Sequence, residues 1–195
     1  VPMYSVGNVF SEQELFAWEK RNLKLLPMSR SNLDIEYFGE LKFDGLAISL
    51  IYEDGKFVRG VTRGDAEVGE DITSNLKMIE SIPLFFGSPR SDLENSKRSD
   101  LFPPYIEVRG EAIMKKSVLK KLNESNEKEG KPLFANSRNV AAGSLRQLDP
   151  KLAQERHLDF FAYEITEIKG QGWQKYLEKH SRKHELLKKL GFEPE

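Results

Sequence analysis

The tetrapeptide Lys42-Phe43-Asp44-Gly45 is the feature of this sequence with the clearest chemical potential. It follows an irregular segment and directly precedes an apolar run that begins at Leu46, so we expect the lysine at the edge of a strand, facing a cleft. Lysine serves as a covalent nucleophile when its amine is neutral. The same four residues also fit a surface lysine beside a turn glycine, and the tetrapeptide alone favours that simpler interpretation.

Further charged residues follow this lysine in ordered blocks. Arg63 lies in Thr62-Arg63-Gly64-Asp65, and Glu111 ends the run Glu107-Val108-Arg109-Gly110-Glu111. A longer block from Phe134 to Pro150 carries Arg138 and Arg146, spaced to share one face of a helix. Taken singly, each has a simpler explanation: a surface ion pair for Arg63, the solvated face of a strand for Glu111 and Arg109, and a basic surface stripe for the last two arginines.

The elements that must position these residues are predicted from periodicity, caps and turns. Ser11 and Glu14 have capping-box spacing, and Asp54-Gly55 is a hairpin turn between two strands. Strands and helices alternate without a regular βαβ pattern, which favours an α+β fold with antiparallel sheets. The predicted strands cover 46–52, 56–62, 106–114 and 158–165; the predicted helices cover 12–22, 71–78, 117–130, 136–148 and 173–190, with irregular segments at 25–32 and 87–104.

Composition sets the remaining limits on function. The 195 residues carry 30 Lys and Arg against 31 Asp and Glu, a net charge of -1, so bulk charge does not predict nucleic-acid binding. Cysteine is absent, which excludes disulfides and Cys-ligated zinc within the chain. With no apolar run long enough to span a membrane and no signal-peptide pattern at Val1, we expect no membrane partner and a cytoplasmic location.

These blocks, in this order, resemble the adenylation domain of bacterial NAD⁺-dependent DNA ligases. The resemblance runs from Pro2-Met3-Tyr4-Ser5 to Phe160-Phe161-Ala162-Tyr163, and so covers nearly the whole chain. The block from Phe134 to Pro150 is its most specific part, because ATP-dependent ligases and capping enzymes share Lys-x-Asp-Gly. The resemblance implies a nucleotidyltransferase fold of the DNA ligase and mRNA-capping type, with antiparallel sheets flanked by helices.

The resemblance implies a role for each matching residue. Lys42 matches the nucleophile that attacks the adenylyl phosphorus of NAD⁺, releases nicotinamide mononucleotide and forms Lys–AMP. Glu40 matches the carboxylate that reads the adenine amino group, Arg63 an arginine near the phosphates and ribose, and Glu111 the ribose-binding carboxylate. Asp44 is implied to orient Lys42 or to assist with metal and phosphate charge.

Four further residues are implied to line the substrate site. Ser5 and Val6 match the pair beside the nucleotide, and Arg138 and Arg146 match arginines used on the phosphate of nicked double-stranded DNA or of nicotinamide mononucleotide. The family also implies Mg²⁺ or Mn²⁺, a role in DNA replication and repair, and a monomeric protein.

The sequence departs from the family pattern in several places. Ala66 stands where glycine is usual, and the family's later lysine-bearing motifs do not occur before Glu195. We therefore expect residues 1–195 to be an adenylation domain that is incomplete at both ends, without the nicotinamide-mononucleotide subdomain, OB-fold, zinc finger and helical repeats, and unable to seal nicks by itself. The alternatives are a different nucleotidyltransferase, such as an ATP-dependent ligase or a capping enzyme, and an inert relative that binds nucleotide or a protein partner.

Two histidines, His180 and His184, have the spacing of metal ligands on a helix. The sequence positions no acidic third ligand beside them. A half-buried or solvated helix face is therefore the preferred interpretation, and we expect no metal site.

Overall fold

The computed structural model describes residues 7–25, 37–65, 68–87 and 101–193, and the chain divides into two units. The smaller unit, Met3–Gly39, carries α1 (Glu12–Leu23). The larger unit runs from Glu40 to the C-terminal end and carries every strand of the described residues. None of the described helices is long and apolar enough to cross a membrane.

Helix α1 begins at the predicted Ser11 cap, but the Glu14 carboxylate bonds the residue before the cap instead of the cap residue that a capping box requires. The Glu14 backbone N–H donates to Ser11 Oγ at 3.2 Å, and the Phe10 N–H donates to Glu14 Oε2 at 2.8 Å. Two otherwise unpaired amides at the helix start are satisfied in this way. The start of the predicted helix is therefore confirmed, and its end falls one residue beyond the predicted Asn22.

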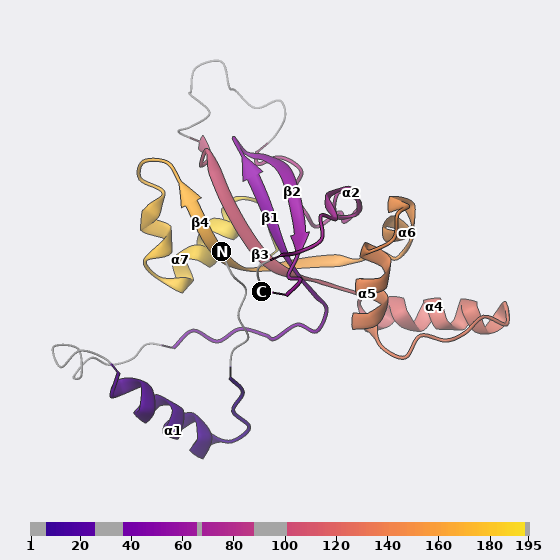
Figure 1. Cartoon of the computed structure of the whole chain (residues 1–195), viewed down its shortest axis with the longest axis horizontal. Coiled ribbons are helices and arrows are strands. Elements are labelled where there is room, and N and C mark those ends of the chain that lie inside the picture. The colour runs from indigo at the N-terminus through magenta and orange to yellow at the C-terminus, as the bar shows by residue number, and fades with distance from the viewer. Residues whose placement is uncertain (1–6, 26–36, 66–67, 88–100, 194–195) are drawn as a thin grey trace. The chain divides into compact units, whose positions relative to one another are not determined.

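Four strands of the larger unit form one antiparallel sheet in the order β2-β1-β3-β4 (Figure 1). The strands are β1 (Leu46–Glu53), β2 (Lys56–Thr62), β3 (Tyr105–Ile113) and β4 (Asp159–Lys169). The first three predicted strands lie within one residue of their expected bounds, the fourth ends at Lys169 and not at the predicted Ile165, and the predicted α+β class is confirmed. Asp54 and Gly55 join β1 to β2 with φ of 46° and 76°, the two positive φ values that a tight hairpin turn of this hand requires.

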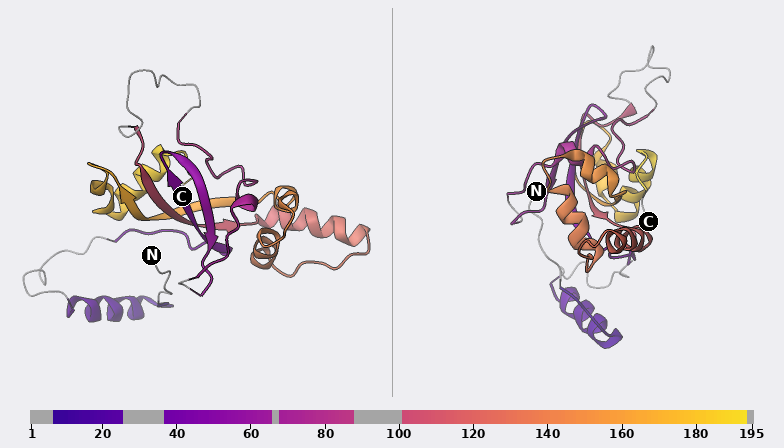
Figure 2. Two further views of the ribbon diagram at one scale, coloured as in Figure 1. Left: turned by 45° about the horizontal axis from the view of Figure 1, so that its top comes forward. Right: turned by 90° about the vertical axis from the view of Figure 1, so that its right-hand side faces the viewer.

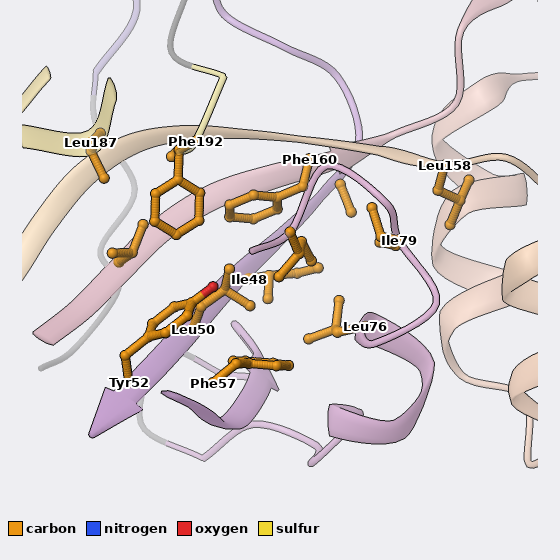
Figure 3. Packing of buried hydrophobic residues seen from close by; sticks show 14 of the residues in the cluster. Ile48, Leu50, Tyr52, Phe57, Leu76, Ile79, Leu158, Phe160, Leu187 and Phe192 are labelled. Carbon is orange, nitrogen blue, oxygen red and sulfur yellow. The ribbon is translucent and has the colours of Figure 1, made fainter. Parts of the chain in front are cut away.

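One face of this sheet forms the hydrophobic core. Ile48 of β1 pairs with Gly110 of β3, which pairs with Ala162 of β4, so this row of residues points to the same side. Leu50, Val108 and Ile165 form the next such row, and all three are fully buried. Figure 3 shows Phe160, Phe192, Tyr52 and Phe57 packed together over this face.

The helices of the larger unit gather near the ends of the sheet. Figures 1 and 2 show α4, α5 and α6 together at one end, while α7 contacts β4. Their bounds are α2 Thr73–Leu76, α4 Lys116–Lys128, α5 Ser137–Leu145, α6 Pro150–Glu155, the 3-10 helix η2 Gln174–Leu177 and α7 His180–Lys189.

Four helix predictions need correction. The helix predicted over 71–78 is limited to Thr73–Leu76, because Asp71 forms an isolated bridge with Val61. The helix predicted over 136–148 ends at Leu145, because a separate helix α6 begins just after it. The Asp149 carboxylate caps α6 by accepting from the Lys151 N–H, and Pro150 occupies its first turn. The helix predicted over 173–190 is divided into η2 and α7 by an extended Lys179 (φ -133°, ψ 141°). Helix α4 begins after Lys115, not at the predicted cap Ser117. Most of the predicted segments 25–32 and 87–104 lies outside the described residues.

Candidate active site

The Lys42–Gly45 segment is held against strand β3 by the glycine at its end. The Gly45 N–H donates to Glu111 Oε1 at 3.1 Å, and Gly45 is buried. A Cβ at this position would lie only 2.1 Å from the carbonyl oxygen of Ala112. The two backbones can approach this closely only because residue 45 has no side chain.

Phe43 fixes the same segment from the other side. Its ring stacks on Phe161, with centroids 4.3 Å apart and an interplanar angle of 22°. Phe161 is the partner of Glu111 across β3 and β4, so one row of the sheet carries both anchors of the segment. Lys42 and Asp44, on either side of this anchored ring, remain exposed.

Glu111 lies at the centre of the charged residues around this segment. Burial raises the pKa of its carboxyl, and the Gly45 N–H and the positive charges of Lys42 and Arg138 act in the opposite direction. The negative charge of Asp44 raises the pKa further. Glu111 therefore has the lysine of the tetrapeptide in its immediate electrostatic surroundings, and its oxygens can accept hydrogen bonds from hydroxyl groups.

Asp44 and Arg138 connect the segment to helix α5. Arg138 Nη1 lies 3.1 Å from Asp44 Oδ1. Asn136 caps α5 by accepting from the Asn139 N–H at 2.8 Å, which fixes the turn that carries Arg138. Both charged side chains are more than half exposed (61% and 73%), so their pairing contributes little to folding stability. Through this pair, the guanidinium of Arg138 is held close to the Lys42–Gly45 segment and remains accessible to solvent.

Tyr163 joins this group and was not identified from the sequence. A register shift in β4 pairs Arg109 with Glu164 and Gly110 with Ala162, which leaves Tyr163 as the extra residue of a β-bulge. Burial raises the pKa of the Tyr163 hydroxyl, Glu111 raises it further, and Arg109 and Arg63 lower it. Tyr163 therefore lies within the electrostatic surroundings of both Arg63 and Glu111. The Arg63 N–H donates to the Ala47 carbonyl at 3.1 Å, just after β2.

Below these groups, the same face of the sheet holds a buried polar network. Ser49 Oγ donates to Glu107 Oε1 at 2.6 Å, and Arg109 Nη2 lies 3.3 Å from the same oxygen. The three residues are 2%, 7% and 8% exposed. The interpretation of Arg109 as part of a solvated strand face is therefore wrong, and buried ions of this kind need their partners.

Two of the other predicted site residues, Arg146 and Glu40, pair with side chains outside this group. Arg146 pairs with Glu70, with its Nε 2.9 Å from Glu70 Oε2. Glu40 Oε1 lies 2.8 Å from His184 Nε2 and 3.1 Å from His180 Nε2. Ser5, Val6 and Ala66 lie outside the described residues.

Fold and site together define an α+β domain whose antiparallel sheet carries a lysine, carboxylate and arginine cluster on its polar face. One protein-family model, described as NAD-dependent DNA ligase adenylation domain, matches residues 1–195. The chain therefore belongs to the NAD-dependent DNA ligase adenylation domain family.

Curated relatives agree with this membership. A DNA ligase from Shouchella clausii is 47% identical over 192 residues, which is 98% of this chain and 25% of the relative. One from Brevibacillus brevis is 47% identical over 98% of this chain and 25% of its own length, and one from Carboxydothermus hydrogenoformans is 50% identical over 87% and 23%. The chain thus spans about a quarter of the length of the curated relatives it matches.

Proposed function

We propose that this chain is the adenylation core of an NAD⁺-dependent DNA ligase, and that Lys42 becomes covalently attached to AMP. The observation that carries the proposal is the Gly45 hydrogen bond to Glu111, which holds the Lys42–Gly45 segment to β3 and keeps the charge of Lys42 within the electrostatic surroundings of Glu111. Family membership supports the same chemistry. With it we propose the nucleotidyltransferase fold of ligases and capping enzymes for the whole domain.

The proposed reaction begins at the Lys42 amine. Its Nζ attacks the adenylyl phosphorus of NAD⁺; a phosphorus–nitrogen bond forms, and the bond to the phosphate oxygen of nicotinamide mononucleotide breaks. The leaving group takes the electron pair of that bond, and the amine loses its proton. An oxygen of the 5′-phosphate of nicked double-stranded DNA then attacks the adenylyl phosphorus, and the phosphorus–nitrogen bond breaks to return the Lys42 amine. The 3′-hydroxyl finally loses its proton and attacks the 5′-phosphorus, so that the phosphodiester bond forms and AMP leaves.

The surrounding residues would position the dinucleotide. Glu111 would accept from the ribose hydroxyls, and Arg63 would pair with a phosphate through its guanidinium. Glu40 would accept from the adenine amino group, while Asp44 would orient Lys42. Ser5 and Val6 would line the nucleotide site.

Phosphates outside the adenylyl group would meet the two exposed arginines. Arg138 and Arg146 each pair with one acidic side chain that is more than half exposed, so a phosphate of DNA or of nicotinamide mononucleotide can replace that partner at low cost. Mg²⁺ or Mn²⁺, which the family implies, would offset phosphate charge, and the exposed carboxylate of Asp44 suits such an ion. We further propose a monomeric, cytoplasmic protein that acts in DNA replication and repair.

Mass spectrometry tests this function directly. The intact protein that contains this chain is incubated with NAD⁺ and Mg²⁺, and in parallel with ATP and Mg²⁺. We expect a mass increase of one adenylyl group with NAD⁺ only, located on the Lys42 peptide and absent in Lys42→Arg. Attachment to another lysine, or adduct formation with ATP alone, would contradict the proposal.

A further inference from the structure

The two histidines at the start of helix α7 lie beside a carboxylate that is far from them in sequence, at the beginning of the larger unit. His180 and His184 are one helical turn apart, so their rings lie on the same face of α7. Glu40 supplies the third group, 144 residues away in sequence from His184. This third ligand is the acidic residue that the sequence did not place beside the histidines.

We propose that Glu40, His180 and His184 bind a divalent transition metal ion of the zinc class. The three donor atoms lie 2.8, 3.1 and 3.2 Å from one another. Ligands at about 2.0–2.1 Å from a tetrahedral zinc ion would be roughly 3.3 Å apart. One face of such a tetrahedron is therefore nearly assembled, and small side-chain shifts complete it.

A second carboxylate supports the histidines from behind. Glu164 Oε2 lies 3.8 Å from His180 Nδ1, on the side of the ring opposite the donor nitrogen Nε2. Glu164 is itself held by Lys183 and by the Ile165 N–H at 2.9 Å. A carboxylate behind a histidine favours the proton on Nδ1 and leaves Nε2 free to bind a metal, the arrangement common in zinc proteins.

Burial and charge also suit a metal ion. The side chains of Glu40, His180 and His184 are 28%, 30% and 11% exposed, so an ion can enter from solvent while most of the donor surface is shielded. Imidazole and carboxylate ligands favour zinc over Mg²⁺, which prefers oxygen ligands alone. Because Lys183 is paired with Glu164, its charge is largely offset beside the site.

Metal binding has a consequence that rests on the proposed function. Glu40 is the residue proposed to read the adenine amino group, and the metal would occupy its Oε1. An ion at this site would therefore compete with the nucleotide. Zinc would therefore inhibit adenylation of Lys42 by occupying Glu40.

Metal titration of the 195-residue chain tests the site, and the absence of cysteine removes the usual competing zinc ligands. The metal-free chain is titrated with Zn²⁺ by calorimetry and with Co²⁺ by visible absorption, in the wild type, His180→Gln, His184→Gln and His157→Asn. His157 is an exposed third histidine with φ of 45°, which asparagine also adopts, so it is the matched control.

We expect one Zn²⁺ per chain, a tetrahedral Co²⁺ spectrum, and binding weakened by about 10- to 100-fold or more in either glutamine variant. His157→Asn should bind like the wild type. Circular dichroism checks that the variants are folded. Failure of the wild type to bind one Zn²⁺, or unchanged affinity in both folded glutamine variants, would overturn the site.

NAD⁺ binding with and without one equivalent of Zn²⁺ separates this site from the proposed function. Weaker NAD⁺ binding with Zn²⁺, restored by His184→Gln, supports both. Zinc binding with unchanged NAD⁺ affinity supports the metal site and contradicts the role of Glu40. NAD⁺ binding in a chain that binds no Zn²⁺ overturns the metal site and leaves the ligase function intact.

Discussion

Replacing Gly45 by alanine is the sharpest test of how the nucleophile's segment is positioned. The new Cβ would lie 2.1 Å from the Ala112 carbonyl oxygen and 2.8 Å from Ile113 Cγ2. The carbonyl belongs to the central strand β3, paired on both sides, so it has little freedom to move. The Lys42–Gly45 segment must then retreat by roughly 1 Å, because packed carbon and oxygen atoms need about 3 Å or more between them.

This retreat has a structural and a chemical cost. It breaks the hydrogen bond from Gly45 to the Glu111 carboxylate, and a hydrogen bond to a charged group contributes about 1.5–3 kcal/mol. The shift relieves the clash with Ala112, so the cost of the clash and the cost of the lost hydrogen bond do not add. We therefore expect the free energy of unfolding to fall by about 1.5–3 kcal/mol. A 1 Å displacement of Lys42 should slow its adenylation about 10²-fold.

Urea unfolding of the chain and the rate of adenylyl transfer in the intact protein measure the two effects. Gly143→Ala is the matched control, because Gly143 is exposed in helix α5 and a Cβ there would meet nothing within 4 Å. That variant should gain about 0.5–1 kcal/mol. If Gly45→Ala matched Gly143→Ala in stability and kept the wild-type rate, the close approach to β3 would not be what positions Lys42.

Three further variants test neighbouring contacts. Glu111→Gln should gain stability relative to the wild type as pH rises from 4 to 8. Burial raises the folded-state pKa of Glu111, so the stabilising contribution of the protonated carboxyl exists at acid pH and is lost as pH rises through that pKa. A difference in the free energy of unfolding in urea that stays constant with pH would contradict this prediction. A double-mutant cycle with Phe43→Leu and Phe161→Leu should give a coupling energy of about 0.5–1.5 kcal/mol, and a value near zero would exclude the stacking contribution. Arg138→Ala should change stability by less than about 0.5 kcal/mol yet reduce nick sealing by the intact protein; normal sealing would remove Arg138 from the phosphate site.

Local signals in the sequence were sufficient for most of the secondary structure. An apolar run rich in β-forming residues predicted β1, Asp54-Gly55 predicted the hairpin turn and its return strand β2, and Ser11 with Glu14 predicted the start of α1. In each case the deciding interaction lies within a few residues of the signal. The helix predicted over 136–148 was too long because periodicity does not mark an end, whereas the Asp149 cap and Pro150 do.

The site could be predicted only in part, because its remaining contacts join residues far apart in the chain. The sequence indicated Lys42, Asp44, Arg63 and Glu111, whose roles remain to be tested. It could not place Glu40 beside His184, since no spacing rule connects residues that far apart.

Tyr163 shows a different limit of sequence reasoning. Its direction depends on a β-bulge, and one extra residue in a strand reverses the face on which the next side chain points. The bulge puts both Tyr163 and Glu164 beside the polar face, where simple alternation would have assigned one of them to the core. Tyr163 consequently lies near Glu111, and Glu164 lies behind His180.

The position of Lys42 is therefore a property of the sheet more than of its own tetrapeptide. Its segment is fixed at three points: the Ala112 carbonyl and the Glu111 carboxylate on β3, and the Phe161 ring on β4. The position of the Phe161 ring beside the two β3 anchors depends on the antiparallel register that pairs Glu111 with Phe161. A shift of β4 by one residue in that register would turn Phe161 toward the core and leave Glu111 where it is, so the pairing that builds the core also brings the two side-chain anchors together.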